Sequence, residues 1–328
     1  MPRGTPYFAG EFTIWTSSRL EAGALGPLFF LFPFSFCLHL GRVKLSAAEI
    51  RQAVRAALAE DIGSGDATTL ATVPLDLTAR AAIRAREPLV VAGIAFAEES
   101  FRQTVGRSRP IRLIRHVHDG RRVKAGETLL TISGPARAIL SAERVALNFV
   151  QRLSGVATLT AQFVEAVRGT MTNILDTRKT TPGWRRFEKY AVACGGGTNH
   201  RLGLFDMILI KDSHLAALRD EGPNAIAAAV ARARTKYPKL KIEVEADTLK
   251  QVEQAIDVGA EIILLDNMTT GQLRQAVKMA KGRATTEASG GVNLETVRAI
   301  AKTGVDFISV GALTHSARAV DIGLDFEK

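Results

Sequence analysis

The second half of the chain alternates between short apolar runs and helical patterns, and this alternation restricts the fold more than any other feature. Six strand-like runs are expected, and several of them end in charged or small polar residues: 172–176, 207–212, 241–246, 261–266, 284–289 and 307–311. Alternating strands and helices are typical of parallel strands joined by right-handed crossovers. We therefore expect a β/α barrel. A doubly wound open sheet is the alternative, but the G-x-G-x-x-G motif that usually follows its first strand is absent.

Residues 43–154 follow a different pattern, which predicts an α+β domain. Ser46 and Glu49 have the spacing of a capping box at the start of an amphipathic helix. Turn signals divide residues 111–134 into short β segments. A long helical stretch follows, with an expected break near Gly155, so we place the domain boundary between 154 and 155. The barrel then covers 155–314, and 315–328 is expected to pack back on the N-terminal domain.

Residues 1–42 fit neither domain. The apolar run at 27–40 is only about half as long as a bilayer-spanning helix, and Pro33 interrupts it. No small-x-small cleavage site follows it. We expect this leader to lie outside the working protein, either disordered or untranslated. We hypothesise that translation begins at Val43, because a GUG start codon inside a longer frame is read as valine. A targeting segment is the alternative.

The formal net charge of +10 indicates acidic partners. Nucleic acid is not expected, because the chain has only 3 Tyr and 2 Trp and no arginine-rich tract interleaved with aromatic residues. The 2 Cys residues have no C-x-x-C spacing, which disfavours a disulfide framework or a cysteine zinc site and favours a reducing compartment. We expect a cytoplasmic protein with no membrane partner.

Cationic side chains gather near the predicted strand ends. The carboxyl ends of barrel strands line the active site in this type of fold. The set comprises Arg178, Lys179, His200, Arg201 and Lys211. Each could be a solvated loop residue, and a single histidine is more often structural. However, such a cluster repels itself unless anions bind there, and arginine suits carboxylate or phosphate recognition. The sequence therefore predicts an anion site at the barrel mouth.

Two carboxylates, Glu245 and Asp266, are expected on the opposite side of this mouth. They could form salt bridges to the same cations, or they could bind sugar hydroxyls, Mg²⁺ or a developing positive charge. Glu243 lies two residues before Glu245. We expect only one of these two glutamates to face the barrel interior.

Glycine-containing turns end the last two predicted strands. The residues concerned are Ser289, Gly290, Gly291, Val310 and Gly311. Late barrel loops often hold a phosphate through backbone N–H groups, although a tight structural turn is the alternative. A ligand with carboxylates, a phosphate and a sugar would suit glycosyl or phosphoribosyl transfer. No Ser-His-Asp order, metalloprotease helix or Walker A loop is present.

Several long segments resemble the quinolinate phosphoribosyltransferase family from about Lys44 to the C-terminus. They include ERVALNFVQRLSGVAT, DTRKTTPGWR, GGGTNHRLGLFDMILIKDSH, EVEADTL, LLDNM and EASGGV. The resemblance implies an α/β fold, with an N-terminal α+β sandwich-like domain and an open, mostly parallel β/α barrel. It implies a homodimer whose active sites are completed by the partner. The implied reaction joins quinolinate to phosphoribosyl pyrophosphate, giving nicotinate mononucleotide, pyrophosphate and CO₂.

The resemblance also implies residue roles. Arg144 would reach a quinolinate carboxylate from the neighbouring subunit, and Thr177, Arg178, His200 and Arg201 would add further substrate contacts. Lys179 and Lys211 would contact both carboxylate and pyrophosphate. Glu245 and Asp266 would hold ribose hydroxyls and, through the substrate, Mg²⁺, and these two acids and two lysines form the expected catalytic set. The glycine turns would cradle the 5′-phosphate.

Two other functions compete with this one. A related phosphoribosyltransferase with the same fold could act on a different acid acceptor, although the full set of Arg144, Arg178, His200 and Arg201 favours a dicarboxylate. A basic nucleic-acid-binding protein is the more distant alternative, and it would show a steep salt dependence of affinity.

Overall fold

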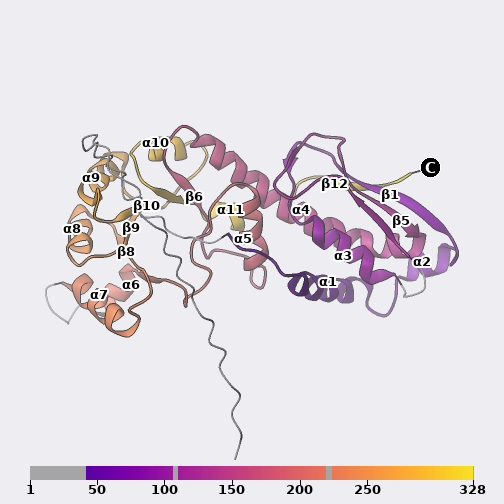
Figure 1. Ribbon diagram of the computed structural model, residues 1–328, viewed down its shortest axis with the longest axis horizontal. Coiled ribbons are helices and arrows are strands. Elements are labelled where there is room, and N and C mark those ends of the chain that lie inside the picture. Colours follow the sequence, from indigo (N-terminus) through magenta and orange to yellow (C-terminus); the bar gives the residue numbers. More distant parts are fainter. Residues whose placement is uncertain (1–41, 106–109, 219–223, 328) are drawn as a thin grey trace, which may run out of the picture. The chain divides into compact units, whose positions relative to one another are not determined.

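The computed structural model describes residues 42–105, 110–218 and 224–327 (Figure 1). The prediction for the leader 1–42 therefore lies outside the described residues, apart from residue 42. None of the helices in the described part of the chain combines the length and the apolar character needed to cross a bilayer.

The N-terminal domain begins with helix α1 (Ala47–Ile62), and the predicted capping box is present. The Ser46 hydroxyl accepts a hydrogen bond from the Glu49 N–H, and the Glu49 carboxylate accepts one from the Ser46 N–H. The Asp66 carboxylate caps the short helix α2 (Ala67–Thr72) in the same way. These caps explain why both helices begin where they do, since the first N–H groups of a helix have no partner inside it.

An antiparallel sheet with the strand order β12-β1-β5-β3 forms the centre of this domain. Its strands are β1 (Thr78–Ala85), β3 (Arg112–Arg115), β5 (Thr128–Pro135) and β12 (Ile322–Glu327), and a separate pair comprises β2 (Leu89–Val90) and β4 (Arg122–Val123). Helix α3 (Ile94–Thr104) and the first half of helix α4 (Ala136–Ala166) contribute to one buried apolar core with β1 and β5. The C-terminal strand β12 pairs with β1, so the last residues of the chain belong to the N-terminal sheet.

Six parallel strands form the second domain, in the order β6-β11-β10-β9-β8-β7. They are β6 (Asn173–Leu175), β7 (Ile208–Ile210), β8 (Ile242–Ala246), β9 (Ile262–Asp266), β10 (Thr285–Ser289) and β11 (Phe307–Ser309). Each lies within its predicted run, which confirms the strand pattern. Within the described residues β6 and β7 pair with only one strand each, so the barrel is open between them.

Helices separate the barrel strands. They are α5 (Arg185–Cys194), α6 (Asp212–Ala217), α7 (Ala225–Lys236), α8 (Leu249–Asp257), α9 (Thr270–Ala280), α10 (Val297–Ala301) and α11 (Ala312–His315). Side chains at helical spacing bury an apolar face against the sheet, as Val252, Ala255 and Ile256 do in α8. This packing fixes the strand ends from which the site residues project.

Helix α4 is continuous over 31 residues, so the predicted break near Gly155 is wrong. Glycine is required there for a different reason. A Cβ atom on Gly155 would lie 1.9 Å from the carbonyl oxygen of Arg318, which crosses the helix at this point. The predicted boundary between 154 and 155 consequently falls inside one helix that is shared by both domains.

Candidate active site

The carboxyl ends of β8, β9 and β10 are aligned at one edge of the barrel. Ala246 pairs with Leu265, and Asp266 pairs with Ser289. Glu245, Asp266 and Ser289 therefore approach the same opening from three neighbouring strands. Lys211 follows β7 directly. Four of the predicted strand-end residues, Lys211, Glu245, Asp266 and Ser289, therefore lie at the same end of the barrel.

Lys211 and Glu245 form an ion pair across the ends of β7 and β8. The Lys211 Nζ lies 3.2 Å from Glu245 Oε2, and the Asp212 N–H donates to Glu245 Oε1 at 3.4 Å. The Lys211 side chain is 46% exposed, whereas that of Glu245 is 10% exposed. The lysine can therefore exchange its protein partner for an anion, while the glutamate stays fixed by its strand.

Asp266 ends β9, and a tight turn follows it. The Asn267 side chain donates to Asp266 Oδ2 at 2.7 Å, and the Asn267 N–H donates to the Ser289 carbonyl at 2.9 Å. Gly290 has a φ of 94°, and a Cβ there would lie 2.1 Å from Asn267 Oδ1. This turn therefore requires glycine both for its backbone conformation and for the close approach of Asn267.

Gly311 marks the corresponding turn after β11. A Cβ at Gly311 would lie 3.1 Å from both Lys179 Cδ and His315 Nε2. Lys179 is held by its backbone, since its N–H donates to Thr177 Oγ1 at 3.0 Å and its carbonyl accepts from Thr314 Oγ1 at 2.7 Å. The loop after β6 thus places Lys179 beside the late turn at which the sequence predicts a phosphate cradle.

Arg178 and Arg201 form a cationic pair with unused donors. Arg201 is buried, and it donates through Nη1 to the Met207 carbonyl at 3.2 Å. The Nε of Arg178 is buried and has no hydrogen-bond partner among the described residues. Burial and the nearby charge of Arg178 both lower the pKa of Arg201. Two such guanidinium groups are an incomplete arrangement, which a carboxylate or phosphate would complete.

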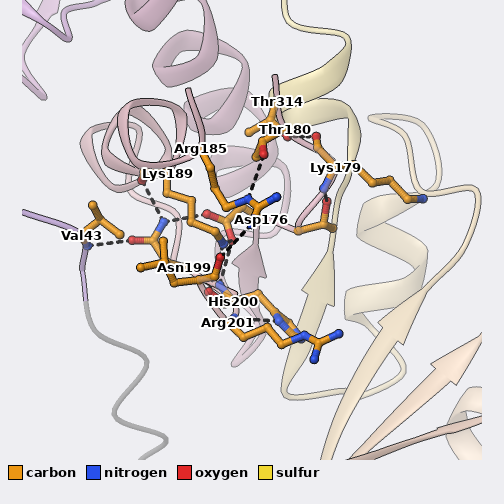
Figure 2. A network of polar contacts seen from close by, with 12 residues as sticks. Val43, Asp176, Lys179, Thr180, Arg185, Lys189, Asn199, His200, Arg201 and Thr314 are labelled. Atoms are coloured by element: carbon orange, nitrogen blue, oxygen red, sulfur yellow. Dashed lines mark hydrogen bonds and ion pairs between the residues drawn. The ribbon is translucent and has the colours of Figure 1, made fainter. Parts of the chain in front are cut away.

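A buried polar network lies beside Arg201 and was not predicted (Figure 2). Asp176 forms a fully buried ion pair with Lys189, and it also accepts from the His200 N–H at 2.8 Å and from Asn199 Nδ2 at 2.7 Å. Lys189 Nζ donates to the His200 carbonyl at 3.0 Å. The Val43 N–H donates to Asn199 Oδ1 at 2.9 Å, so the first described residues contact this network.

Both side chains of the ion pair are fully buried. Burial raises the pKa of Asp176 and lowers that of Lys189, and the attraction between the two opposes each shift. A buried pair of this kind needs its extra hydrogen bonds, and Asn199 and the His200 backbone supply them. The sequence signal for this network is an aspartate directly at the end of the apolar run 172–176.

Glu243, Glu287 and His200 form a second buried cluster. His200 Nε2 lies 3.1 Å from Glu243 Oε2 and 3.4 Å from Glu287 Oε2. Burial and the neighbouring Glu287 raise the pKa of Glu243 to about 7. Against the effect of burial, the two glutamates raise the pKa of His200, whereas the Arg201 N–H, which donates to Nδ1, opposes a second proton on the ring. The cluster as a whole therefore holds a proton more strongly than the separate groups would.

The expectation that only one of Glu243 and Glu245 faces the barrel interior is wrong. Both do, because residues two apart on a strand share a face. Glu243 contacts His200, and Glu245 contacts Lys211 one layer nearer the mouth. Among the described residues, His200, Glu243 and Glu287 are also the only group of three potential metal ligands whose ligand atoms lie within 4.8 Å of one another.

Arg144 is not brought to this mouth by the chain's own contacts. It is an exposed residue of α4, next to the buried Val145. Its side chain makes no hydrogen bond or ion pair within the part of the chain that the structure describes. It is therefore available to a second molecule, as the sequence resemblance implies.

An open parallel barrel with an α+β partner domain and a cationic mouth facing two acids defines a class of enzymes that act on polyanionic substrates. Family comparisons specify this class further. Residues 66–154 match the sequence model for the N-terminal domain of quinolinate phosphoribosyl transferase, and residues 156–325 match that for its C-terminal domain. The chain belongs to the quinolinate phosphoribosyltransferase family.

Individual relatives agree with this assignment. The chain is 46% identical over 279 residues to the nicotinate-nucleotide pyrophosphorylase [carboxylating] of Mycobacterium leprae, which covers 84% of this chain and 96% of that protein. It is 40% identical over 295 residues to the mitochondrial quinolinate phosphoribosyltransferase [decarboxylating] 2b of Nicotiana tabacum, covering 85% and 82%. The solved nicotinate-nucleotide pyrophosphorylase of Francisella tularensis is similar with a TM-score of 0.81 and 40% identity, covering 87% and 99%.

Proposed function

We propose that this protein transfers a phosphoribosyl group from phosphoribosyl pyrophosphate to quinolinate and releases pyrophosphate and CO₂, forming nicotinate mononucleotide for NAD biosynthesis. The observation that carries the proposal is the incomplete cationic pair of Arg178 and Arg201, in the same barrel as the strand-end acids Glu245 and Asp266. A dicarboxylate would supply the missing hydrogen-bond acceptors for the two arginines. The two acids would stabilise the positive charge that develops on a ribose. The family membership and the relatives' names support the same reaction.

The first step breaks the bond between the ribose carbon C1 and the pyrophosphate oxygen. Lys179 and Lys211 stabilise the negative charge that collects on the leaving group, because both lysines follow strands that end at the mouth. The carboxylates of Glu245 and Asp266 stabilise the positive charge on the sugar. The pyridine nitrogen of quinolinate then forms its bond to C1, and the ring becomes cationic.

Decarboxylation follows from this charge. The bond between the ring carbon C2 and its carboxylate breaks, CO₂ leaves, and the electron pair stays on C2 beside the cationic nitrogen. A proton then replaces the lost carboxylate. The protein's part is to orient the acid through Arg178 and Arg201 and to exclude other poses. No separate decarboxylating cofactor enters this scheme.

We expect Mg²⁺ as the metal, held by Glu245 and Asp266 together with the substrate. The donors fit, because both acids offer only oxygen ligands, and Asp266 Oδ1 has no hydrogen-bond partner among the described residues. When bound, Mg²⁺ would neutralise part of the negative charge of the pyrophosphate. Removal of divalent metal with EDTA should abolish turnover, and added Mg²⁺ should restore it.

We further propose a homodimer in which Arg144 of one protomer reaches the mouth of the other. The exposed, unpaired side chain of Arg144 supports this arrangement. We also propose a cytoplasmic location. Because the tobacco relative is named as mitochondrial, fractionation of the native cells is the appropriate test.

The decisive experiment is release of CO₂ from carboxyl-labelled quinolinate, with and without phosphoribosyl pyrophosphate. Release that requires both substrates supports the proposal. Turnover with nicotinate but not with quinolinate would instead indicate a related transferase with another acid acceptor.

A further inference from the structure

His200 is fixed by the protein at four of its polar atoms. Its backbone N–H donates to Asp176 at 2.8 Å, and its carbonyl accepts from Lys189 at 3.0 Å. Its ring Nδ1 accepts from the Arg201 N–H at 2.8 Å, while Nε2 faces the two buried glutamates. The ring therefore has a single orientation.

The hydrogen bond from the Arg201 backbone determines which ring nitrogen carries hydrogen. An N–H group can donate only to a lone pair, so Nδ1 is unprotonated in this geometry and Nε2 carries the hydrogen. A ring in this form has no lone pair at Nε2 for a metal ion. The grouping of one histidine and two glutamates is therefore better explained by orientation of the ring than by metal binding.

Glu243 and Glu287 come from β8 and β10, the strands on either side of β9. Alternate strands of a barrel supply the side chains of one interior layer, which explains how these two converge. Their exposed fractions are 0% and 2%, and three of their four carboxylate oxygens lack a hydrogen-bond partner among the described residues. Burying two carboxylates costs free energy unless they are paired with another group. The His200 ring is the group that both of them contact.

The ring in turn supports Arg201. The peptide N–H of Arg201 is held by His200 Nδ1, and its guanidinium is held by the Met207 carbonyl. One hydrogen bond therefore fixes the backbone of Arg201, and another fixes its guanidinium group. A shift of the ring would move the Arg201 backbone, and with it the guanidinium at the mouth.

We infer that Glu243 and Glu287 are positioning residues, which hold the His200 ring in its Nε2–H form so that Nδ1 orients Arg201 toward the acid substrate. This inference deepens the proposed function and rests on it where it concerns quinolinate. The state of the ring, however, can be measured without any substrate.

The test uses the full-length protein labelled with ¹⁵N-histidine. Ring nitrogen signals of His200 are assigned by their loss in a His200→Asn variant. At neutral pH we expect Nδ1 unprotonated and Nε2 protonated. In the double variant Glu243→Gln/Glu287→Gln, the side chains keep their size and shape but can present amide N–H groups to Nε2. We therefore expect a mixture of the Nδ1–H and Nε2–H tautomers of His200.

Kinetics provide the second measurement. Each single Gln variant should raise the KM for quinolinate on the order of tenfold, because a small displacement of an orienting group weakens binding and alignment. The KM for phosphoribosyl pyrophosphate should stay nearly constant. Glu98→Gln is the matched control, since Glu98 is a buried carboxylate paired with Arg115 in the other domain. It should leave the ring signals and both KM values unchanged, even if it lowers stability.

A wild-type ring protonated at Nδ1 would overturn the inference. Gln variants with the parent ring signals and the parent quinolinate KM would overturn it as well. If the protein shows no turnover with quinolinate at all, the proposed function fails, and the ring measurement still decides the tautomer.

Discussion

Lys211 Nζ and Glu245 Oε2 lie 3.2 Å apart across the ends of β7 and β8. Each neutralises the other in the protein without substrate. Binding of a pyrophosphate by Lys211 would release Glu245 to face the sugar. The pair therefore couples the side of the mouth that receives the leaving group to the side that receives the developing cation.

Replacing Glu245 with Gln should lower kcat more than it raises the KM for quinolinate. The expected loss of transition-state stabilisation is about 2–4 kcal/mol, which is typical of removing one well-placed electrostatic group. Asp266→Asn should behave in the same way. Asp247→Asn is the control, because Asp247 is an exposed residue just after the same strand. Near-normal steady-state kinetics in both site variants would show that these acids do not face the sugar.

Arg144→Ala should abolish turnover although the residue lies outside the barrel. The expected cause is loss of a contact that one protomer makes to the substrate of its partner. Mixing the inactive Arg144→Ala and Lys211→Ala proteins should restore part of the activity, because some hybrid dimers carry one intact site. Absence of recovery after verified subunit exchange would argue against a shared site.

Lys189→Met should destabilise the protein by about 3–5 kcal/mol, because it leaves Asp176 as a buried charge without its ion-pair partner. Chemical denaturation measures the free energy of unfolding. Lys302→Met serves as the control, since Lys302 is exposed. A loss no larger than that of the control would mean that Asn199 and the His200 backbone alone can satisfy the aspartate.

The barrel strands could be predicted from sequence because buried parallel strands are continuous apolar runs, and all six lie within the predicted limits. The cations after these strands could be predicted as site residues, because the predicted strand ends mark where the mouth of the barrel lies. The pairing of Asp176 with Lys189 was missed, because nothing in the sequence shows that a helix brings Lys189 back under the end of β6.

Glu243 was readable as an acid between the apolar residues Ile242 and Val244 of β8, which is itself an unusual signal, whereas Glu287 lies in the largely polar strand β10. Their joint contact with His200 could not be read, because it depends on the curvature that brings β8 and β10 toward one another. The expected helix break at Gly155 failed because glycine was required there by the backbone at Arg318, far away in the sequence.

The Glu49 carboxylate should contribute to stability in a pH-dependent way. Hydrogen bonds from Ser46 and Arg186 lower its pKa from 4.5 to about 2. Its contribution is therefore complete above about pH 4.5 and is lost as the pH falls toward 2. Glu49→Gln should cost about 1 kcal/mol near neutral pH, as loss of a helix cap does, and the difference from wild type should shrink in acid.

The matched control for this pH series is Glu60→Gln, an exposed substitution on the same helix. Unfolding free energies measured between pH 3 and 7 should show little difference between this variant and wild type. A Glu49→Gln effect that stays constant over the whole range would contradict the assignment.

Gly155→Ala should destabilise the protein, although alanine is the better helix former. The added Cβ would collide with the Arg318 carbonyl, and overpacking of this kind costs about 1–3 kcal/mol. Gly271→Ala in α9 is the comparison, because the nearest atom to its Cβ would be 3.9 Å away. That variant should be neutral or more stable. Equal thermal stability of both variants would show that the 318 segment can move aside.

The pairing of β12 with β1 has a consequence for how the polypeptide matures on the ribosome. The N-terminal sheet lacks its edge strand until β12 has been synthesised, after the whole barrel, because Arg80 pairs with Glu327 and Ala85 with Ile322. The barrel is in effect inserted into this domain and can assemble first. A nascent chain stalled before β12 would therefore expose an unpaired strand to neighbouring chains, and deletion of Ile322–Glu327 would leave a permanent edge prone to aggregation.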